Sequence, residues 1–353
     1  MNTSKIISKH NQILFPYSKG LVNNGSHNIV NTTLQCFAQV EEFTKYFLDP
    51  KNQEKILSNK NKYKLSIAFI EILNNLWLNN NLKPYSTCYL EKKINEINSK
   101  FKIEESDFKG LICFLLDKMN NELNEIYDLK KLNNKNQNII ENIDDYNLEL
   151  DFKNFSYNFE KTHNSIISNI FYGIYHFEIE CSKCKNIKSG FNPYNLLSFS
   201  LVEVKELINK KGKLVDLYDC LEYFEKTKEL NREKQMICQK CMDLKNGLVN
   251  IKIITFPNIL IINLQRKNKQ QYDIKLKIEE YLINFGNYNY ELIGIIKNLG
   301  FNNGACHNYI AFCKSFSNKK WYIYSDELVK PSSIEEAIST GVSNILIYSL
   351  QKD

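Results

Sequence analysis

The pattern of apolar and polar positions divides the chain into two parts. In the first part, apolar residues recur at helical spacing and predict helices over residues 31–48, 63–77 and 108–123. The third helical segment, DFKGLICFLLDKMNNEL, opens with an acidic residue, which is favourable at a helix N-terminus. We therefore expect the chain up to about residue 125 to be mainly helical.

The part after residue 166 has the pattern of β-strands. Short runs rich in Ile, Phe, Tyr and Val alternate there with turn residues. These runs are YGIYHFEIEC, LLSFSLVEV, LVNIKIITF, NILIINLQR, YELIGIIKN, HNYIAFCK, KWYIYSDELV and SNILIYSL. They predict a mainly antiparallel sheet, so the predicted fold class is α+β, a helical lobe followed by a sheet lobe. The crevice between two such lobes is the default place for a site.

Composition sets limits on this picture. The chain has 353 residues, of which 43% are hydrophobic, and this is typical of a globular protein rather than a mostly disordered one. Its formal charge of +6 is spread along the chain without a dense basic block, so we expect no direct binding to nucleic acid. Residues 128–160 are polar and weakly periodic, and we interpret them as a linker or insertion.

The sequence carries no signal for export or for a membrane. Its N-terminus lacks an apolar segment of signal-peptide length, and its most apolar run, IITFPNILIINL, is interrupted by Pro257. These features predict a soluble intracellular protein of the nucleus or cytoplasm, without a membrane partner. Its ten Cys residues are then expected to be reduced, which leaves packing, metal binding or nucleophilic chemistry as their roles.

Four of the cysteines form two CxxC pairs, Cys181 with Cys184 and Cys238 with Cys241. Each pair interrupts a β-like run at a turn-like position, and four thiolates satisfy tetrahedral zinc. We predict one closed, structural zinc site without an open position for water. The alternatives are chance pairs of buried cysteines and redox chemistry. Redox chemistry is disfavoured because neither pair opens a helix after a strand.

The remaining cysteines differ in their surroundings. Five lie among apolar residues and are predicted to be core residues, namely Cys36, Cys88, Cys113, Cys220 and Cys313. Cys306, in NNGACHNY, is the one beside a histidine, His307, and is therefore considered as a thiol with possible chemistry.

The sequence resembles the ubiquitin-specific proteases through four blocks that follow in the family's order. GLVNNGSHNIVNTTLQCF is similar to G-L-x-N-x-G-N-T-C-Y-x-N-S-x-L-Q-C, and ESDFKGLICFLLDKM is similar to Q-Q-D-A-H-E-F followed by a helix. The third block is the CxxC set with ITFPNILIINLQR, which looks like x-L-P-x-V-L-x-x-x-L-K-R-F. The fourth contains YELIGIIKNLG, HNYIAFCK, KWYIYSDELV and NILIYSL, which look like the family's closing strands.

This resemblance implies a papain-like fold with a helical thumb, an antiparallel β palm and zinc-bearing β fingers. Residues 1–19 would form an N-terminal extension and residues 20–353 the ubiquitin-specific-protease-like domain. Its parts would be the thumb 20–127, the linker or insertion 128–160, the fingers and part of the palm 161–265, and the rest of the palm 266–353. LYDCLEYFEKTKEL and YELIGI look most like the histone-deubiquitinating subunit of the SAGA coactivator.

The family's catalytic triad falls on residues that cannot perform its chemistry. Aligned without gaps, the nucleophilic Cys falls on Asn28, whose amide has no ionised nucleophilic form near neutral pH. The His base falls on Asn308, which cannot accept the thiol proton, and the orienting acid falls on Ser325. Asn23 matches the family's oxyanion-stabilising Asn, but an oxyanion donor supplies little without a nucleophile. The resemblance therefore implies that no catalytic residue of the triad is intact.

The family's positions that hold the ubiquitin tail are altered as well. Asp107 matches the family motif, but Lys109 and Gly110 replace a His and a Glu that help hold the tail. Residues 265–267 read Gln-Arg-Lys in place of K-R-F.

A shifted triad is the enzymatic alternative. It would use Cys306 as the thiol, His307 as the base and Asp326 as the acid. Adjacent residues of a strand point to opposite faces, so His307 would point away from the site that Asn308 faces unless a one-residue bulge rotated it inward. The simpler interpretation of Cys306 and His307 is a loop or strand-edge pair without chemistry.

The sequence thus predicts a catalytically inactive ubiquitin-specific-protease-like protein, not an enzyme, which binds ubiquitin or a ubiquitinated or ubiquitin-like partner. The first alternative is a scaffold subunit of a chromatin or other multiprotein complex that does not bind ubiquitin. The second alternative is an active cysteine-type deubiquitinase with the shifted site. Zinc is the cofactor that these interpretations imply.

Overall fold

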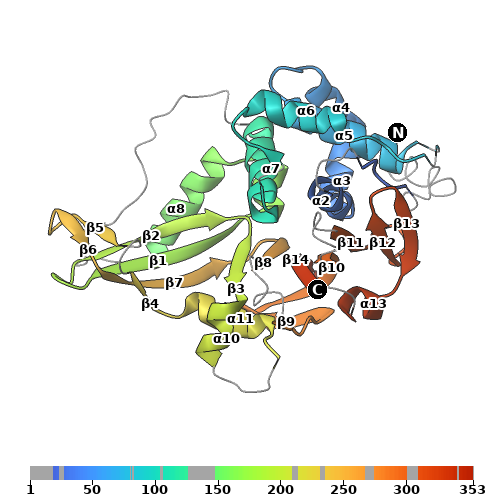
Figure 1. Cartoon of the computed structure of the whole chain (residues 1–353). Coiled ribbons are helices and arrows are strands. Elements are labelled where there is room, and N and C mark those ends of the chain that lie inside the picture. The colour runs from blue at the N-terminus through green and yellow to red at the C-terminus, as the bar shows by residue number, and fades with distance from the viewer. Residues whose placement is uncertain are drawn as a thin grey trace.

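Helices dominate the N-terminal part of the structure and strands the C-terminal part (Figure 1), which confirms the predicted α+β class. The structure is a computed structural model and describes residues 19–23, 28–79, 81, 83–103, 106–125, 148–208, 214–230, 235–266, 274–299, 309–339 and 342–352. Its helices are α2 Ile29–Ala38, α3 Glu41–Leu48, α4 Pro50–Leu57, α5 Lys64–Trp77, α6 Cys88–Ile97, α7 Phe108–Leu123, α8 Leu148–Thr162, α9 Ile166–Phe171, α10 Leu201–Ile208, α11 Leu217–Glu225 and α13 Ile334–Ser339.

The strands form two larger sheets and one hairpin. The finger sheet has the order β2-β1-β7-β4 and contains β1 Gly173–Cys181, β2 Ile187–Tyr194, β4 Lys228–Leu230 and β7 Gly247–Thr255. The palm sheet has the order β13-β12-β11-β10-β14-β8-β3, with β9 paired to β10. Its strands are β3 Leu197–Ser200, β8 Ile259–Gln265, β9 Tyr281–Phe285, β10 Tyr288–Asn298, β11 Tyr309–Lys314, β12 Trp321–Ser325, β13 Leu328–Ser332 and β14 Val342–Leu350. The hairpin pairs β5 Met236–Cys238 with β6 Asp243–Lys245.

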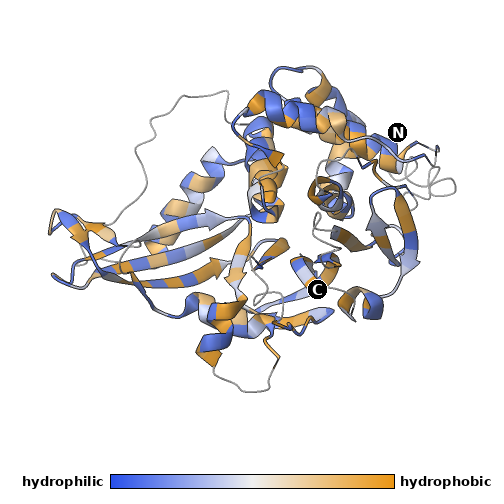
Figure 2. Cartoon of the chain, in the orientation of Figure 1, coloured by the Kyte–Doolittle hydropathy of each residue, from blue (hydrophilic) through white to orange (hydrophobic). Residues whose placement is uncertain are grey.

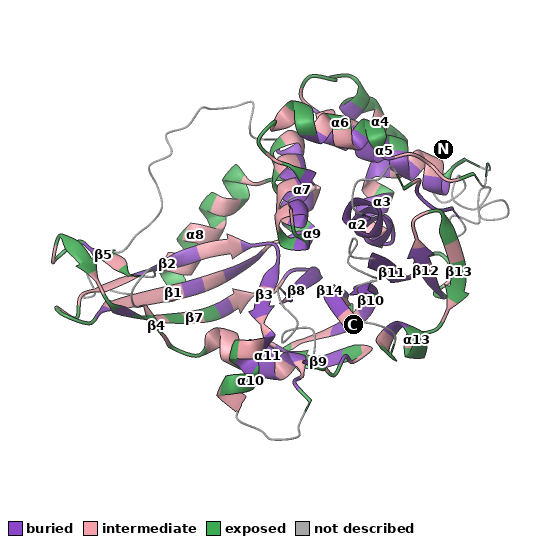
Figure 3. Ribbon diagram, viewed as in Figure 1, coloured by how far each residue is buried: buried purple, intermediate pink, exposed green. Residues whose placement is uncertain are grey.

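The central strands of the palm sheet are buried on both faces because two hydrophobic cores flank them. On β14, Ile345 and Ile347 belong to the core shared with α2, α3, α5, α7 and α9, whereas Leu346 and Tyr348 belong to the core shared with α10 and α11. Successive side chains of a strand point to opposite faces, so a strand with two cores reads as a continuous apolar run. Figure 3 shows the consequence, with β8, β10 and β14 buried while much of the finger sheet and of β5 is more exposed.

One long predicted helix is two helices in the structure. The prediction over 31–48 is wrong at Gln39 and Val40, where the chain leaves the helix between α2 and α3. The carbonyl of Ala38 accepts hydrogen bonds from Thr44 Oγ1 at 2.9 Å and from Trp77 Nε1 at 3.2 Å. These side-chain donors satisfy a helix-end carbonyl that otherwise has no partner within its helix, so they stabilise the break.

Two of the predicted strand runs also need correction. In LLSFSLVEV, the strand ends at Ser200 and α10 follows, because the buried residues Leu201 and Val204 have helical spacing. The run KWYIYSDELV is a hairpin of β12 and β13, with Ser325 opposite Leu328. Its turn includes Asp326 at a φ of 47°, a left-handed conformation that Asp tolerates better than most residues. The sheet is not purely antiparallel either, since β3 pairs with β8 in parallel.

The range 128–160, interpreted as a linker or insertion, contains a helix that the sequence analysis did not predict. Residues 128–147 lie outside the described residues, and α8 follows them. Its Phe residues are separated by polar ones, so its periodicity is weak in the sequence, as the alternating colours of Figure 2 show. In the part of the chain that the structure describes, no helix has the length and apolar character needed to span a membrane.

Candidate functional site

Asn28 lies at the contact between the helical lobe and the palm sheet. It precedes α2 and is buried. Its Nδ2 donates a hydrogen bond to the carbonyl oxygen of Tyr309 at 2.7 Å, and its Oδ1 accepts one from the Tyr309 backbone N–H at 3.3 Å. The two ends of one amide therefore bind the backbone at the start of β11. This arrangement holds α2 against the palm, and it engages both polar atoms of the side chain that the sequence analysis aligned with the nucleophile.

A second set of contacts joins the first segment of the chain to the β12–β13 turn. The carboxylate of Asp326 accepts hydrogen bonds from Asn23 Nδ2 at 2.9 Å and from Asn31 Nδ2 at 2.8 Å. The backbone N–H of Leu21 donates to the carbonyl of Asp326 at 2.9 Å. A side chain at Gly20 would place its Cβ 2.3 Å from the carbonyl oxygen of Glu327, so this close approach requires glycine.

The remaining triad-related positions are only partly described. Ser325 ends β12 and is half-buried, one residue before Asp326. Asn308, Cys306 and His307 lie outside the described residues. The structure thus brings Asn28 to the residue that follows Asn308 in the chain, and Asn23 to Asp326. Sequence reasoning missed Asn31, although this residue lies within the quoted motif block and one helical turn after Asn28.

The N-terminus of α7 contacts the same region. Asp107 caps this helix by accepting a hydrogen bond from the Gly110 N–H at 2.8 Å, and the ring of Phe108 packs edge-on against Tyr309 at 4.7 Å. Lys109 is exposed. Arg266 is buried and donates from Nε to the carbonyl of Ser343 at 2.8 Å, so its role is structural.

The four cysteines of the CxxC pairs come together at the end of the finger sheet. The Sγ atoms of Cys181, Cys184, Cys238 and Cys241 all lie within 4.8 Å of one another. Cys181 ends β1 and Cys238 ends β5, so the sheet and the hairpin each contribute one pair. This cluster has the donor set and the proximity that a tetrahedral metal ion requires.

The two CxxC turns have the same backbone geometry. The Lys185 N–H donates to the carbonyl of Cys181 at 2.9 Å, and the Met242 N–H donates to the carbonyl of Cys238 at 2.7 Å. Both donor residues have positive φ, 60° and 53°. A conformation that is unfavourable for Lys and Met thus recurs at equivalent positions. The matching strain supports a common function of the two turns in presenting thiols.

The thiols of the cluster differ in acidity. Hydrogen bonding from the backbone of Cys184 lowers the pKa of the Cys181 thiol to about 6. Hydrogen bonding with the Cys184 side chain raises the pKa of the Cys241 thiol to about 12. Cys181 therefore loses its proton more readily than a free thiol, and Cys241 less readily.

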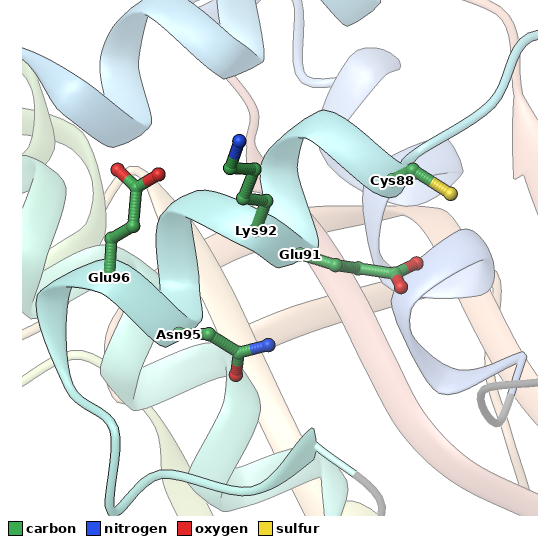
Figure 4. A pocket seen from close by; sticks show the side chains of 5 residues that line it. All are labelled: Cys88, Glu91, Lys92, Asn95 and Glu96. Atoms are coloured by element: carbon green, nitrogen blue, oxygen red, sulfur yellow. The ribbon is translucent and has the colours of Figure 1, made fainter.

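The other described cysteines only partly fit the prediction that they are core residues. Cys36, Cys220 and Cys313 are buried, but Cys113 is only partly buried and Cys88 is exposed. Cys88 begins α6, where the polar side chains of the following turns keep it at the surface. It lines a shallow surface hollow of about 510 Å³ with Glu91, Lys92, Asn95 and Glu96 (Figure 4). All five residues come from this one helix and their side chains spread apart, so the hollow shows no catalytic constellation.

Comparisons with known proteins match nearly the whole chain. The family model described as "Ubiquitin carboxyl-terminal hydrolase" matches residues 19–348. Among similar curated proteins, Ubiquitin carboxyl-terminal hydrolase Usp2 of Drosophila melanogaster is 24% identical over 93% of this chain. Human Ubiquitin carboxyl-terminal hydrolase 2 is 23% identical over 94% of the chain. Ubiquitin carboxyl-terminal hydrolase 5 of Saccharomyces cerevisiae is 24% identical over 93%. The chain spans between 34% and 55% of these three relatives' own length.

Proposed function

The chain belongs to the ubiquitin carboxyl-terminal hydrolase family, and from this premise we propose that it is a member without catalytic activity that binds ubiquitin or a ubiquitinated partner. The observation that carries the proposal is the side chain of Asn28 and its hydrogen bonds. An amide stands at the nucleophile position, and both of its polar ends are bound to the backbone of Tyr309. No acyl transfer starts from such a group, because neither a thiolate nor a hydroxyl is present there.

The assignment of the other triad positions supports the same proposal. Tyr309 follows Asn308 directly, so its contact with Asn28 agrees with an alignment that places the nucleophile and base positions next to each other. At the acid position, Ser325 has no carboxylate. The carboxylate of Asp326 is occupied by the amides of Asn23 and Asn31, so in the shifted triad it would have to leave these partners before it could orient a histidine.

We propose that the cysteine cluster holds one zinc ion. Cys181, Cys184, Cys238 and Cys241 fit this ion because four sulfur donors complete a tetrahedral shell. Such a closed shell leaves no position for water, so the ion would stabilise the end of the finger sheet and take no part in chemistry. In this proposal the thumb (20–127), the fingers with part of the palm (161–265) and the rest of the palm (266–353) remain a binding scaffold.

A binding experiment with an electrophilic probe tests this function. Ubiquitin should bind reversibly, measured by isothermal titration calorimetry, while a ubiquitin carrying a C-terminal electrophile should leave no covalent adduct in intact-mass spectra. Ubiquitin that lacks its C-terminal tail serves as the matched control for contacts near Asn28. An adduct mapped to Cys306 would establish the shifted active site.

Absence of ubiquitin binding would favour the scaffold alternative. In that case the protein would act as a subunit of a chromatin or other multiprotein complex through protein contacts alone. The likeness to the histone-deubiquitinating subunit of SAGA, based on LYDCLEYFEKTKEL and YELIGI, is the reason to include a chromatin complex. Native purification followed by mass spectrometry distinguishes the two functions, because only the scaffold is expected in a stable complex without ubiquitin.

A further inference from the structure

Helix α8 packs on one half of the finger sheet. The rings of Phe152 and Phe155 lie 5.6 Å and 5.5 Å from the ring of Phe191 on β2, measured between centroids. Phe191 is paired in register with His176 of β1, and the two rings are 5.0 Å apart. Figure 1 shows α8 beside β1 and β2, inclined to them. This helix therefore packs on the aromatic face of these strands at Phe191.

The residues of α8 remain partly or fully exposed, whereas His176 and Phe191 of the sheet are buried. None of the residues of α8 is buried, although Phe152, Phe155 and Phe159 lie on one face of the helix and are partly covered. Tyr157, on the opposite face, is 57% exposed. By contrast, His176 and Phe191 beneath the helix are each only 6% exposed. A helix that buries none of its own residues contributes little to folding, and its main effect is to shield an apolar surface.

The C-terminal end of α8 is anchored to the neighbouring helices. The side-chain amide of Asn124 donates to the carbonyl of Thr162, and the Glu125 N–H donates to the carbonyl of Asn164 at 3.2 Å. The ring of Phe159 lies 6.0 Å from that of Tyr172. These contacts fix one end of the helix at the junction of α7 and β1.

A continuous stripe on α7 connects this junction with the region of Asn28. Asp107, Gly110, Cys113 and Asp117 follow one face of the helix, at intervals of three or four residues. At the end of this stripe the Tyr172 hydroxyl donates to Asp117 at 2.6 Å. A protein that contacts the N-terminus of α7 and extends along this face therefore reaches α8.

The part of the same sheet face that α8 leaves uncovered belongs to β7. Lys252 pairs with His176 and Asn250 pairs with Glu178, so these β7 residues share the face on which α8 lies. Both are exposed. The face thus has a covered aromatic half and an open polar half. We propose that α8 is an internal competitor that occupies part of the partner-binding surface, and that ubiquitin displaces it from Phe191.

This inference rests on the proposed ubiquitin binding. Displacement of α8 costs free energy, because it exposes the aromatic face to water unless the partner covers that face. The apparent affinity for ubiquitin is reduced by the fraction of molecules in which α8 is bound to the sheet. Weakening the docking of α8 should therefore strengthen the binding of ubiquitin.

The test compares two variants of the full chain. Phe152→Ser combined with Phe155→Ser removes the rings that contact Phe191, and Tyr157→Ser is the matched control on the opposite face of α8. We expect the double variant to bind ubiquitin about fivefold more tightly or better by calorimetry, and the control to bind like the wild type. In the wild-type protein, ubiquitin should also speed amide hydrogen exchange in residues 148–162, a measurement that stays decisive if the double variant fails to fold.

The outcomes separate this inference from the proposed function. Unchanged or weaker binding by a folded double variant, or exchange in residues 148–162 that ubiquitin leaves unchanged, overturns the competitor role and leaves ubiquitin binding intact. If the double variant binds ubiquitin and the wild type does not, α8 blocks binding completely in the wild type, which supports the competitor role. Absence of ubiquitin binding in both proteins overturns the competitor role together with the proposed function.

Discussion

The cysteine cluster and the Asn28 region are both built from segments far apart in the chain, but they differ in the chemistry of their side chains. The cluster joins two CxxC pairs, and all four side chains remain the same type of metal donor. The Asn28 region joins the start of α2, the start of β11 and the β12–β13 turn, and there side-chain amides donate hydrogen bonds to a backbone carbonyl or to a carboxylate. One region presents four metal donors, whereas in the other the side chains form hydrogen bonds within the protein.

The difference follows from what each arrangement requires. Four thiols within 4.8 Å of one another have the donor set of a tetrahedral metal site, so a cation would complete the cluster. The amide of Asn28 is satisfied by Tyr309 without any ligand. A buried side chain whose polar atoms are bonded within the protein stabilises the fold without a ligand.

The largest expected effect therefore lies at the cluster. Replacing Cys181 and Cys238 together with Ser should abolish binding of about one zinc per chain and unfold the end of the finger sheet. Structural zinc sites contribute an apparent binding free energy of about 10–16 kcal/mol in small peptides. Elemental analysis and hydrogen exchange of the finger strands measure the two effects.

Cys88→Ser is the control for this change, since Cys88 is exposed on α6 and distant in sequence from the cluster. It should leave the zinc content and the exchange of the finger strands unchanged. Zinc retained by the double variant would show that these four cysteines are not the ligands.

A smaller effect is expected at the Asn28 contact. Asn28→Ala removes both hydrogen bonds to the Tyr309 backbone and should lower the free energy of unfolding by about 1–3 kcal/mol, the usual cost of leaving buried polar groups without partners. Asn95→Ala, an exposed Asn on α6, should change it by less than about 0.5 kcal/mol. Urea denaturation measures both. Equal stability of the two variants would mean that Asn28 does not hold α2 to the palm.

The sequence predicted the two regions unequally for a physical reason. CxxC spacing is local, so the sequence itself reveals the candidate metal ligands. A single zinc ion that needs four thiolates predicts that the two distant pairs lie together. The amide contacts of Asn28 with Tyr309 and of Asn31 with Asp326 join residues separated by most of the chain, and no local pattern reveals them. The motif alignment supplied the position of Asn28 but not its partner.

Similar reasoning explains the errors in the elements. The segment 108–123 matches α7 because its apolar spacing, acidic cap and length all agree. LLSFSLVEV could not be resolved because a short apolar run fits both a strand and a buried helix. Helix α8 was missed because its aromatic residues are set among polar ones, and its docking surface on Phe191 is visible only in three dimensions.

A weaker effect is expected at Asp326. Asp326→Asn keeps the size of the side chain but removes a charged acceptor shared by Asn23 and Asn31, and we expect a loss of about 1 kcal/mol in unfolding free energy. The adjacent Glu327→Gln is the control, because Glu327 is exposed, and its effect should stay within about 0.5 kcal/mol. A loss as large as that of Asn28→Ala would mean that the turn, rather than the Tyr309 contact, is the main link between these segments.

The smallest expected effect is on activity, when the triad is rebuilt. Asn28→Cys, Asn308→His and Ser325→Asp together supply a thiol, a base and an orienting acid, yet we expect no hydrolysis of a fluorogenic ubiquitin substrate above the buffer rate. In the alignment of the sequence analysis, His307 replaces a Gly of the family beside the path of the ubiquitin tail, and by that alignment a side chain at this position would remove the space for a close approach. The same alignment gives Lys109 and Gly110 in place of the His and Glu that help hold the tail.

Further changes should then raise the rate stepwise, in the order His307→Gly, Lys109→His and Gly110→Glu. The last of these requires a local adjustment, because a Cβ at position 110 would lie 2.7 Å from Ser106 Oγ, a hydroxyl that can rotate away.

Alkylation of the new thiol at position 28 by iodoacetamide, followed by peptide mass spectrometry, provides the decisive readout. Reaction with iodoacetamide but not with the ubiquitin probe would locate the lost function in the tail path. If the reactivity of this thiol does not depend on Asn308→His, then positions 28 and 308 do not meet, and the proposed base position is wrong. In that case the contact of Asn28 with Tyr309 serves packing alone, and the start of β11 does not correspond to the position of the catalytic base in the family.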